Sequence, residues 1–245
     1  MREQDIIQSV APFFEEIEKF GYEVLATSDF DRILHYIPET GRKTQTPMMA
    51  IDRQDFARSE AFWLLLLKDG KAVAGAGAKY VDLEDEPIET YLQRTSRGQY
   101  GRDSDPLLSV SRPVRDYVRG RLIYLGELEF HPDHRGNKDL LEAFVKVLQG
   151  LAAVKWRNFD WMYVFIDEDH LRFAHIYDFQ ITVRDAITWA EPVPAGRLNT
   201  HCLMATEGRH IGHVLRSAKA RLMAAPSQPL APVTMATFPL RSSRF

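Results

Sequence analysis

Apolar residues recur every three or four positions near the start of the chain, and this spacing predicts an amphipathic helix over residues 3–20. Gly21 follows the last apolar position and ends the helix. A short apolar run over residues 22–26 precedes Asp29 and Asp31, whose carboxylates could cap a second, shorter helix that Pro38 stops. Because the first helix has one apolar face, we expect it to cover a sheet. That face consists of Ile6, Ile7, Val10, Phe13, Phe14, Ile17 and Phe20.

Two apolar runs joined by a polar turn give the clearest local pattern in the sequence. The runs span residues 62–67 and 72–80, and the turn between them contains Asp69 and Gly70. An Asp-Gly pair between two apolar runs is typical of a tight hairpin, because both turn residues must adopt positive φ. We therefore predict a β-hairpin at this position.

The sequence between Asp82 and Arg121 is polar and rich in glycine, proline and arginine. A loop of that length inside a compact domain is uncommon unless it is functional or mobile. We therefore interpret residues 82–121 as an insertion or lid. Its arginines could bind an acidic substrate or a nucleotide phosphate, or could equally lie on a solvated loop. They are Arg94, Arg97, Arg102, Arg112, Arg115, Arg119 and Arg121.

A strand, a polar turn and a helix follow one another after this segment. The strand covers residues 122–130, and the helix runs from about Lys138 to Val154. Another apolar run at 161–166 follows closely, so the strand-helix-strand order predicts two parallel strands. The remaining pattern predicts a short helix at 171–179, strands near 183–189 and 201–205, and a helix over 211–224.

Length and composition allow one sizeable core, either as one large domain or as two small ones, and we favour one α/β domain with an insertion. The 245 residues of the chain are 45% hydrophobic, so we predict a single domain over residues 1–224 and a proline-rich tail over 225–245. The net charge of −3 gives no field that would favour a nucleic acid or an anionic membrane as partner. Cys202 is the only cysteine, which excludes an intrachain disulfide. With no signal peptide or long apolar stretch, we expect a cytoplasmic protein.

The turn from His131 to Gly136 carries the candidate chemistry. A strand that ends in a polar turn and opens a helix leaves the first N–H groups of that helix unpaired at its positive end. Such a site can hold a pyrophosphate, and Arg135 and Lys138 would add positive charge beside it. His131, Asp133 and His134 lack a further set of metal ligands in the sequence, so we predict no metal.

These residues resemble motif A of the GNAT acyltransferase superfamily. In that motif a strand reading L-x-V-x-P is followed by R-G-x-G-x-G/A at the start of a helix. Leu128, Phe130, Pro132, Arg135 and Gly136 match the motif in order and spacing. The strand and helix predicted around them are those that the motif requires.

The resemblance extends beyond this motif with some departures. The two later glycines of motif A are Lys138 and Leu140 here, and glycine is the residue that lets a backbone approach a phosphate closely. The segment 173–179 resembles the family's A-x-x-x-Y-x-x-G-F element without its glycine. Together with the hairpin, the resemblance covers about residues 22–206, interrupted by the segment before Leu122.

The resemblance implies a GNAT-like mixed central sheet flanked by helices, with a long insertion before the motif A strand. It also implies an acyl-CoA-dependent N-acyltransferase acting on a small amine or amino-acid-like acceptor. Acetyl-CoA or another acyl-CoA would be the co-substrate, and residues 82–121 would shape the acceptor pocket. The residues that the resemblance places around the acyl-CoA are Leu128, Phe130, His134, Arg135, Gly136, Asn137, Lys138 and Asp139.

The resemblance also implies roles in catalysis. Strand alternation puts Glu127 and Glu129 on one face and Leu128 and Phe130 on the other. Glu127 has the position of a glutamate that deprotonates the amine in many family members, with Glu129 as the second candidate. Backbone N–H groups near Leu128 and Phe130 would hold the oxyanion, and Tyr177 would protonate the departing thiolate.

Other interpretations of the same residues remain open. The two glutamates could be a solvated sheet face, and Tyr177 could be ordinary helix packing. The chain could be an enzyme similar to acyl-homoserine-lactone synthases, or a catalytically degenerate domain of this fold that senses a ligand or binds a protein. The missing glycines favour the degenerate domain. We expect a small-molecule amine acceptor and no nucleic-acid or membrane partner, and leave a homodimer open.

Overall fold

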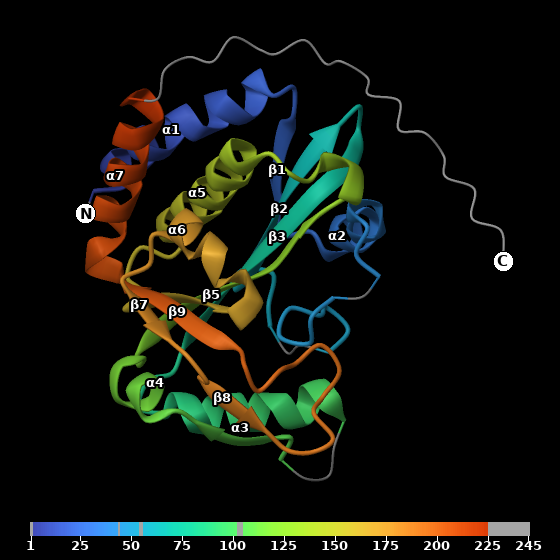
Figure 1. The fold of residues 1–245 in the computed structure, drawn as a ribbon, viewed down its shortest axis with the longest axis vertical. Coiled ribbons are helices and arrows are strands. Elements are labelled where there is room, and N and C mark those ends of the chain that lie inside the picture. The colour runs from blue at the N-terminus through green and yellow to red at the C-terminus, as the bar shows by residue number, and fades with distance from the viewer. Residues whose placement is uncertain (1, 44, 54–55, 102–104, 225–245) are drawn as a thin grey trace, which may run out of the picture.

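The computed structural model of the protein describes residues 2–43, 45–53, 56–101 and 105–224. The proline-rich tail predicted over 225–245 lies outside the described residues. Helices lie on both sides of a central sheet (Figure 1). The sheet has seven strands in the order β1-β2-β3-β5-β6-β9-β7. They are β1 (Glu23–Thr27), β2 (Ala61–Lys68), β3 (Lys71–Asp82), β5 (Arg121–Phe130), β6 (Trp161–Ile166), β9 (Cys202–Glu207) and β7 (Ile181–Val183).

The sheet is mixed, as the sequence predicts. β5 and β6 are parallel and are joined by α5 (Lys138–Lys155), whereas the other neighbouring pairs are antiparallel. The hairpin of β2 and β3 turns at Asp69 and Gly70, whose φ angles of 52° and 77° are both positive. Two successive positive φ angles match the twist of the flanking strands, which explains the Asp-Gly pair.

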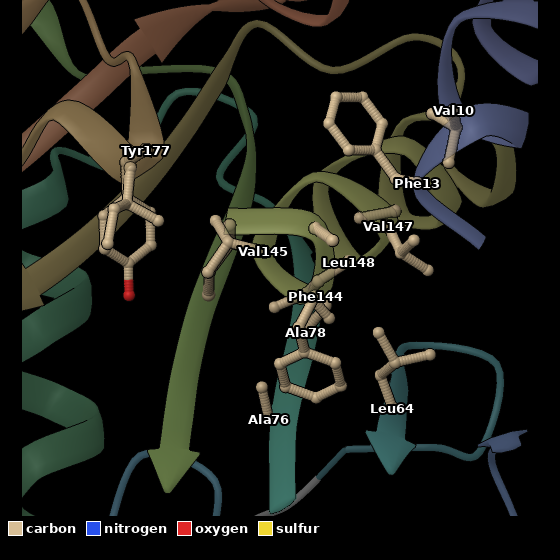
Figure 2. Packing of buried hydrophobic residues seen from close by; sticks show 14 of the residues in the cluster. Val10, Phe13, Leu64, Ala76, Ala78, Phe144, Val145, Val147, Leu148 and Tyr177 are labelled. Carbon is tan, nitrogen blue, oxygen red and sulfur yellow. The ribbon is translucent and has the colours of Figure 1, made fainter. Parts of the chain in front are cut away.

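One face of the sheet is covered by α1 (Glu3–Lys19), α5 and α7 (Ile211–Ala224), as their apolar faces predict. Alternate residues of the strands point to this face, and α5 packs across them. Figure 2 shows Phe144 of α5 above Ala76 and Ala78 of β3, and Val10 and Phe13 approaching α5 from α1. The first core of the protein therefore lies between these helices and the sheet.

The opposite face carries a second core. It is covered by α2 (Phe30–Tyr36), the short 3-10 helix η1 (Ile37–Thr40), α3 (Ile88–Tyr100) and α4 (Arg112–Tyr117). A small sheet of β4 (Leu107–Val110) and β8 (Ile187–Trp189) belongs to the same layer. The strand residues that alternate with those of the first core point to this face and pack into the second core. Trp63, Leu122 and Tyr163 are among them. The period of two along each strand thus divides the interior into two cores.

The segment 82–121 is more ordered than an inserted loop, because it forms α3, β4 and α4. Ile88, Leu92 and Val114 from this segment are buried in the second core. Most of its arginines pair with carboxylates at the surface. The segment therefore looks polar in sequence, although the side that faces the second core is apolar. The pairs are Arg94 with Glu86, Arg97 with Asp105, Arg112 with Asp116, Arg115 with Glu89 and Arg121 with Asp160.

Two predicted elements differ in the structure. The helix predicted at 171–179 is a 3-10 helix, η3 (Glu168–Phe173), followed by a single turn, α6 (Ala174–Tyr177). The single strand predicted near 183–189 is wrong, because Asp185 has a φ of 46° and turns the chain. β7 therefore ends in the large sheet, and β8 begins in the small one.

No helix in the described part of the chain is both long enough and apolar enough to cross a lipid bilayer.

Candidate functional site

A β-bulge interrupts β5 where it pairs with β3. Two residues of β5, Glu127 and Leu128, face the single residue Ala76 across this pair. Glu127 has a φ of 62°, a left-handed conformation that non-glycine residues rarely adopt. Bulges redirect side chains, and residues held in rare backbone conformations cluster at functional sites. The bulge therefore makes this part of β5 a candidate functional site.

The bulge decides where the two glutamates point. Strict alternation along β5 would put Glu127 on the same side as Leu125, facing α5. The extra residue shifts the alternation of side chains by one position beyond the bulge. Leu128 and Phe130 therefore pack toward the α5 side instead. Glu127 and Glu129 both approach Arg42 on the opposite side. They share a face, as alternation predicts, but that face lies toward the second core.

β5 and β6 separate at the level of the bulge. They pair from Leu122 opposite Trp161 to Leu125 opposite Val164, while β5 continues to Phe130 and β6 to Ile166. A cavity of about 310 Å³ lies in the resulting gap. Its walls come from both sides of the sheet. They include Tyr124, Gly126, Glu127, Leu128, Leu141, Val164, Phe165, Ile166, Asp167, Tyr177, Arg197 and His201.

Glu127 is a buried carboxylate on the wall of this cavity. Its Oε1 accepts a hydrogen bond of 2.5 Å from the Thr46 N–H and lies 3.6 Å from Arg42 Nη1. Its Oε2 has no hydrogen-bond partner among the residues that the structure describes. Burial raises the pKa of this carboxyl above its ordinary value, opposed by Arg42, Thr46 and Arg197. One oxygen is thus held in place and the other is free to receive a proton.

Glu129 has a different environment, although it lies only two residues away. Its side chain is partly exposed and binds two arginines, with Arg135 Nη2 at 2.6 Å and Arg42 Nη2 at 3.6 Å. Glu129 does not line the cavity. Of the two candidate bases, only Glu127 reaches the place where a reacting group would fit.

Tyr177 ends α6 and lines the cavity. Its ring lies at the margin of the first core (Figure 2). The Tyr177 carbonyl accepts a hydrogen bond of 2.8 Å from Gln149 Nε2, which ties α6 to α5. Burial raises the pKa of the phenol well above its usual range, so that the hydroxyl keeps its proton at neutral pH. Tyr177 can therefore act as a donor toward the cavity.

The turn that leads into α5 lies outside the cavity and faces solvent. Asn137 caps the helix, its Oδ1 accepting a hydrogen bond of 3.0 Å from the Leu140 N–H. Arg135 folds back along β5, where its Nε donates to the Phe130 carbonyl at 2.8 Å. Gly136 has a φ of 96°, and no heavy atom lies within 4 Å of the position of a β-carbon there. The start of α5 is thus open, although one of its amides is already bonded.

The predicted site residues separate into two groups. The cavity brings together Glu127, Leu128 and Tyr177. Phe130 is buried beneath α5, where its ring contacts Phe144. The other predicted acyl-CoA contacts lie along the open turn and the first turn of α5. They are His134, Arg135, Gly136, Asn137, Lys138 and Asp139.

Arg197 is a cavity residue that the sequence pattern does not reveal. It lies in the loop between β8 and β9, and only 6% of its surface is exposed. Its Nε donates a hydrogen bond of 2.5 Å to Tyr100 Oη, and its guanidinium lies over the Trp189 ring at 5.6 Å. Its Nη2 has no hydrogen-bond partner within the described ranges of the chain. Because Arg197 stands alone in an irregular loop, no periodicity or motif could have identified it.

Arg42 and Tyr124 are also cavity residues that sequence reasoning missed. Arg42 donates from Nη2 to the Leu128 carbonyl at 3.3 Å, and its Nε is buried without a partner among the described residues. The Tyr124 ring lies against Gly126, where a β-carbon would come within 2.6 Å of Tyr124 Cε1. Glycine at 126 is thus the residue that lets the tyrosine lie flat beside the bulge.

Within residues 2–43, 45–53, 56–101 and 105–224, no group of three or more His, Cys, Asp or Glu side chains is arranged to hold a metal ion.

Comparisons with known proteins give matches among solved structures. No family model matches the chain, and no curated protein matches it. An agmatine N-acetyltransferase mutant in its apo form is 13% identical, with 76% of this chain and 100% of that chain covered and a TM-score of 0.46. An acyl-CoA N-acyltransferase from Pseudomonas aeruginosa is 10% identical, with 76% and 99% covered and a TM-score of 0.40.

A CoA-dependent acyl-homoserine lactone synthase, BjaI, is 12% identical, with 81% of this chain and 90% of that chain covered and a TM-score of 0.43. At these identities and TM-scores the likeness concerns the fold alone. The chemistry of the cavity therefore rests on its own residues.

Proposed function

We propose that the protein is an acyl-CoA-dependent N-acyltransferase that acts on a small amine. The observation that carries the proposal is the cavity between the separated strands β5 and β6, with the free Oε2 of Glu127 on its wall. In this reaction the acceptor nitrogen bonds to the thioester carbonyl carbon and the carbon–sulfur bond breaks. An acceptor that arrives as an ammonium ion first gives one proton to Glu127, which passes it to solvent. The neutral amine then loses a second proton as the sulfur gains one, giving an amide and free CoA.

Glu127 is the base in this proposal. Thr46 and Arg42 hold Oε1, so that Oε2 is the oxygen left to accept a proton. A carboxyl whose pKa is raised by burial takes a proton from an ammonium group more readily than an exposed one. Glu129 is already bound by two arginines and does not line the cavity, so it has no part as a base.

The open edge of β5 supplies donors on the other side of the reacting carbonyl. β6 no longer pairs with β5 beyond Leu125, and an antiparallel bulge leaves its extra residue unpaired toward β3. We assign the Leu128 N–H to the developing negative charge on the carbonyl oxygen. Tyr177, which keeps its proton, is the donor to the sulfur as the bond to it breaks.

The shape of the cavity and its surroundings fit an acyl-CoA. Val164, Ile166 and Leu141 give the gap an apolar wall, which suits a thin acyl-thioester arm. The open start of α5, with Arg135 and Lys138 exposed beside it, suits the phosphates. A volume of about 310 Å³ lies at the low end of the range for ligand pockets, which favours a short acyl group such as acetyl.

A pair of matched substitutions tests the proposal. Free thiol is measured as it is released from acetyl-CoA in the presence of a panel of small amines. Glu127→Gln should lower kcat by a factor of about 100 or more, because it removes the base. It should leave acyl-CoA affinity, measured by thermal shift, unchanged. Glu129→Gln, two residues away, should keep most of the turnover.

Two outcomes would contradict the proposal. Turnover in Glu127→Gln equal to that of the unaltered protein would remove Glu127 from the reaction. No thiol release and no thermal shift with acetyl-CoA or longer acyl-CoAs would instead favour a binding module of this fold.

A further inference from the structure

We infer that the acceptor carries a carboxylate beside its amine, and that Arg197 binds this carboxylate while Glu127 takes the proton of the amine. The inference rests on the proposed acyl transfer and names its class of acceptor: small amino acids. It depends on Arg197, a buried cation at the cavity that the transfer step itself does not use.

Arg197 is fixed in place by neutral groups. Tyr100 accepts its Nε–H at 2.5 Å, and Trp189 lies beneath the guanidinium plane. Neither contact balances the charge, and no carboxylate lies within 4.0 Å of Arg197 among the residues that the structure describes. A buried charge without a counter-ion is costly, so its retention at a cavity indicates that an anion arrives from outside.

The other arginine of the cavity already has carboxylate partners. Arg42 lies between Glu127 and Glu129, 3.6 Å from each. Asp167 caps η3, where its Oδ1 accepts from the Asp169 N–H at 3.2 Å. Burial, together with the charge of Arg197, lowers the pKa of His201, so that this imidazole is neutral at pH 7. Of the two arginines that line the cavity, Arg197 is the one with no carboxylate within 4.0 Å among the described residues.

One unmatched guanidinium fits a monoanion better than a phosphate dianion. Arg197 lines the cavity, and its buried Nη2 has no hydrogen-bond partner among the described residues, so it is the N–H group left to donate to a carboxylate oxygen. Burial raises the pKa of Glu127, and the positive charge of Arg197 is one of the effects that oppose this rise. The two groups therefore lie within electrostatic reach of each other. A compact molecule with both an amine and a carboxylate can thus meet Glu127 and Arg197 at once.

The α3 segment contributes to this arrangement through Tyr100. Tyr100 is the last residue of α3, and its hydroxyl holds Arg197 from a position 97 residues earlier in the chain. Residues 82–121 would thereby shape the acceptor pocket by positioning one arginine. Most arginines of this segment pair with carboxylates at the surface instead.

The test compares acceptors that differ only in the carboxylate. Thiol release from acetyl-CoA is measured with a series of small amino acids, their primary amides and the corresponding decarboxylated amines. We expect kcat/KM to be about 100-fold higher for the amino acids, because the decarboxylated amines leave a buried donor unpaired and the amides lack the negative charge that balances the guanidinium. This comparison uses the unaltered protein, so it does not depend on whether a variant folds.

Substitutions then assign the selectivity to Arg197. Arg197→Met should reduce the preference for the carboxylate to nearly none and leave the KM for acetyl-CoA unchanged. Tyr100→Phe should raise the KM for the amino acid while kcat changes little, since it only loosens the arginine. Arg112→Gln alters an exposed arginine of α4, in the same segment 82–121, and is the matched control. It should change neither the preference for the carboxylate nor the KM for the amino acid.

The outcomes separate the two proposals. Decarboxylated amines and amides used as well as amino acids would overturn the carboxylate inference and leave the acyltransferase intact. A preference that survives Arg197→Met in a folded variant would overturn the role of Arg197. No thiol release with any acceptor would remove both the transferase and its acceptor class.

Discussion

Lys146 gives a quantitative prediction, because it is a lysine with no exposed surface in the middle of α5. Its Nζ lies 3.0 Å from Asp178 Oδ2, and Arg221 binds the same carboxylate. Burial lowers the pKa of Lys146 from 10.5 to about 8, more than Asp178 and Glu142 raise it. The folded protein therefore releases this proton at a lower pH than the unfolded chain does.

The sign of the stability effect follows from proton binding. Between pH 8 and 10.5 the unfolded chain holds more protons at Lys146 than the folded protein, so the free energy of unfolding increases with pH. Below pH 8 both states are protonated, and the full cost of burying the ammonium is present. One pKa unit corresponds to about 1.36 kcal/mol, so the whole change is about 3 kcal/mol.

The prediction is tested with Lys146→Met, which keeps a long unbranched side chain and removes the titrating group. The free energy of unfolding is measured by urea denaturation, followed by tryptophan fluorescence, at several pH values from 7 to 10. The stability of the unaltered protein relative to Lys146→Met should increase by about 2 to 3 kcal/mol over that range. Other groups, such as the buried Lys79, titrate in both proteins and cancel in the difference.

Lys138→Met, at the exposed start of the same helix, is the control and should show no such change with pH. A difference between the unaltered protein and Lys146→Met that stays constant from pH 7 to 10 would refute the reasoning. It would mean that Lys146 remains charged inside the folded protein, balanced by Asp178.

Two further predictions concern helix packing and the proton donor. Gly98→Ala, in α3, should stabilise the protein by about 0.5–1 kcal/mol, because alanine favours a helix and nothing lies within 4 Å of the new β-carbon. Gly150→Ala, in α5, should instead destabilise it by about 1–3 kcal/mol, because the new atom overlaps Val10 of α1. Urea denaturation measures both changes in the free energy of unfolding. Two changes in the same direction would contradict the packing argument. Tyr177→Phe should lower turnover about 100-fold without changing the thermal shift by acetyl-CoA, and thiol release at the rate of the unaltered protein would exclude Tyr177 as the donor.

The elements that the sequence predicts well are those whose signal is local. The helix ending before Gly21 and the helix beginning after Asn137 each have an apolar stripe and a recognisable end. The hairpin at Asp69 and Gly70 follows from the turn chemistry of two residues. The parallel pairing of β5 and β6 follows from the short connection through α5.

The elements that the sequence misses depend on distant contacts. Residues 82–121 look like a polar loop because their arginines outnumber the apolar positions that α3 and β4 bury against the second core. Asp185 has no local feature that would predict its left-handed turn between two sheets. The bulge at Glu127 likewise depends on register with β3, which no pattern within β5 specifies.

The sequence by itself determined the class of fold, the strand and helix around motif A, and Glu127, Leu128 and Tyr177 as residues of interest. The tertiary structure decided which face Glu127 occupies, where β5 and β6 separate, and that Arg42 and Arg197 reach the same cavity. The physical reason is the range of the interactions. Periodicity and turn chemistry act between neighbours in the chain, whereas Arg197 meets Tyr100 across 97 residues, and only the folded chain brings their side chains together.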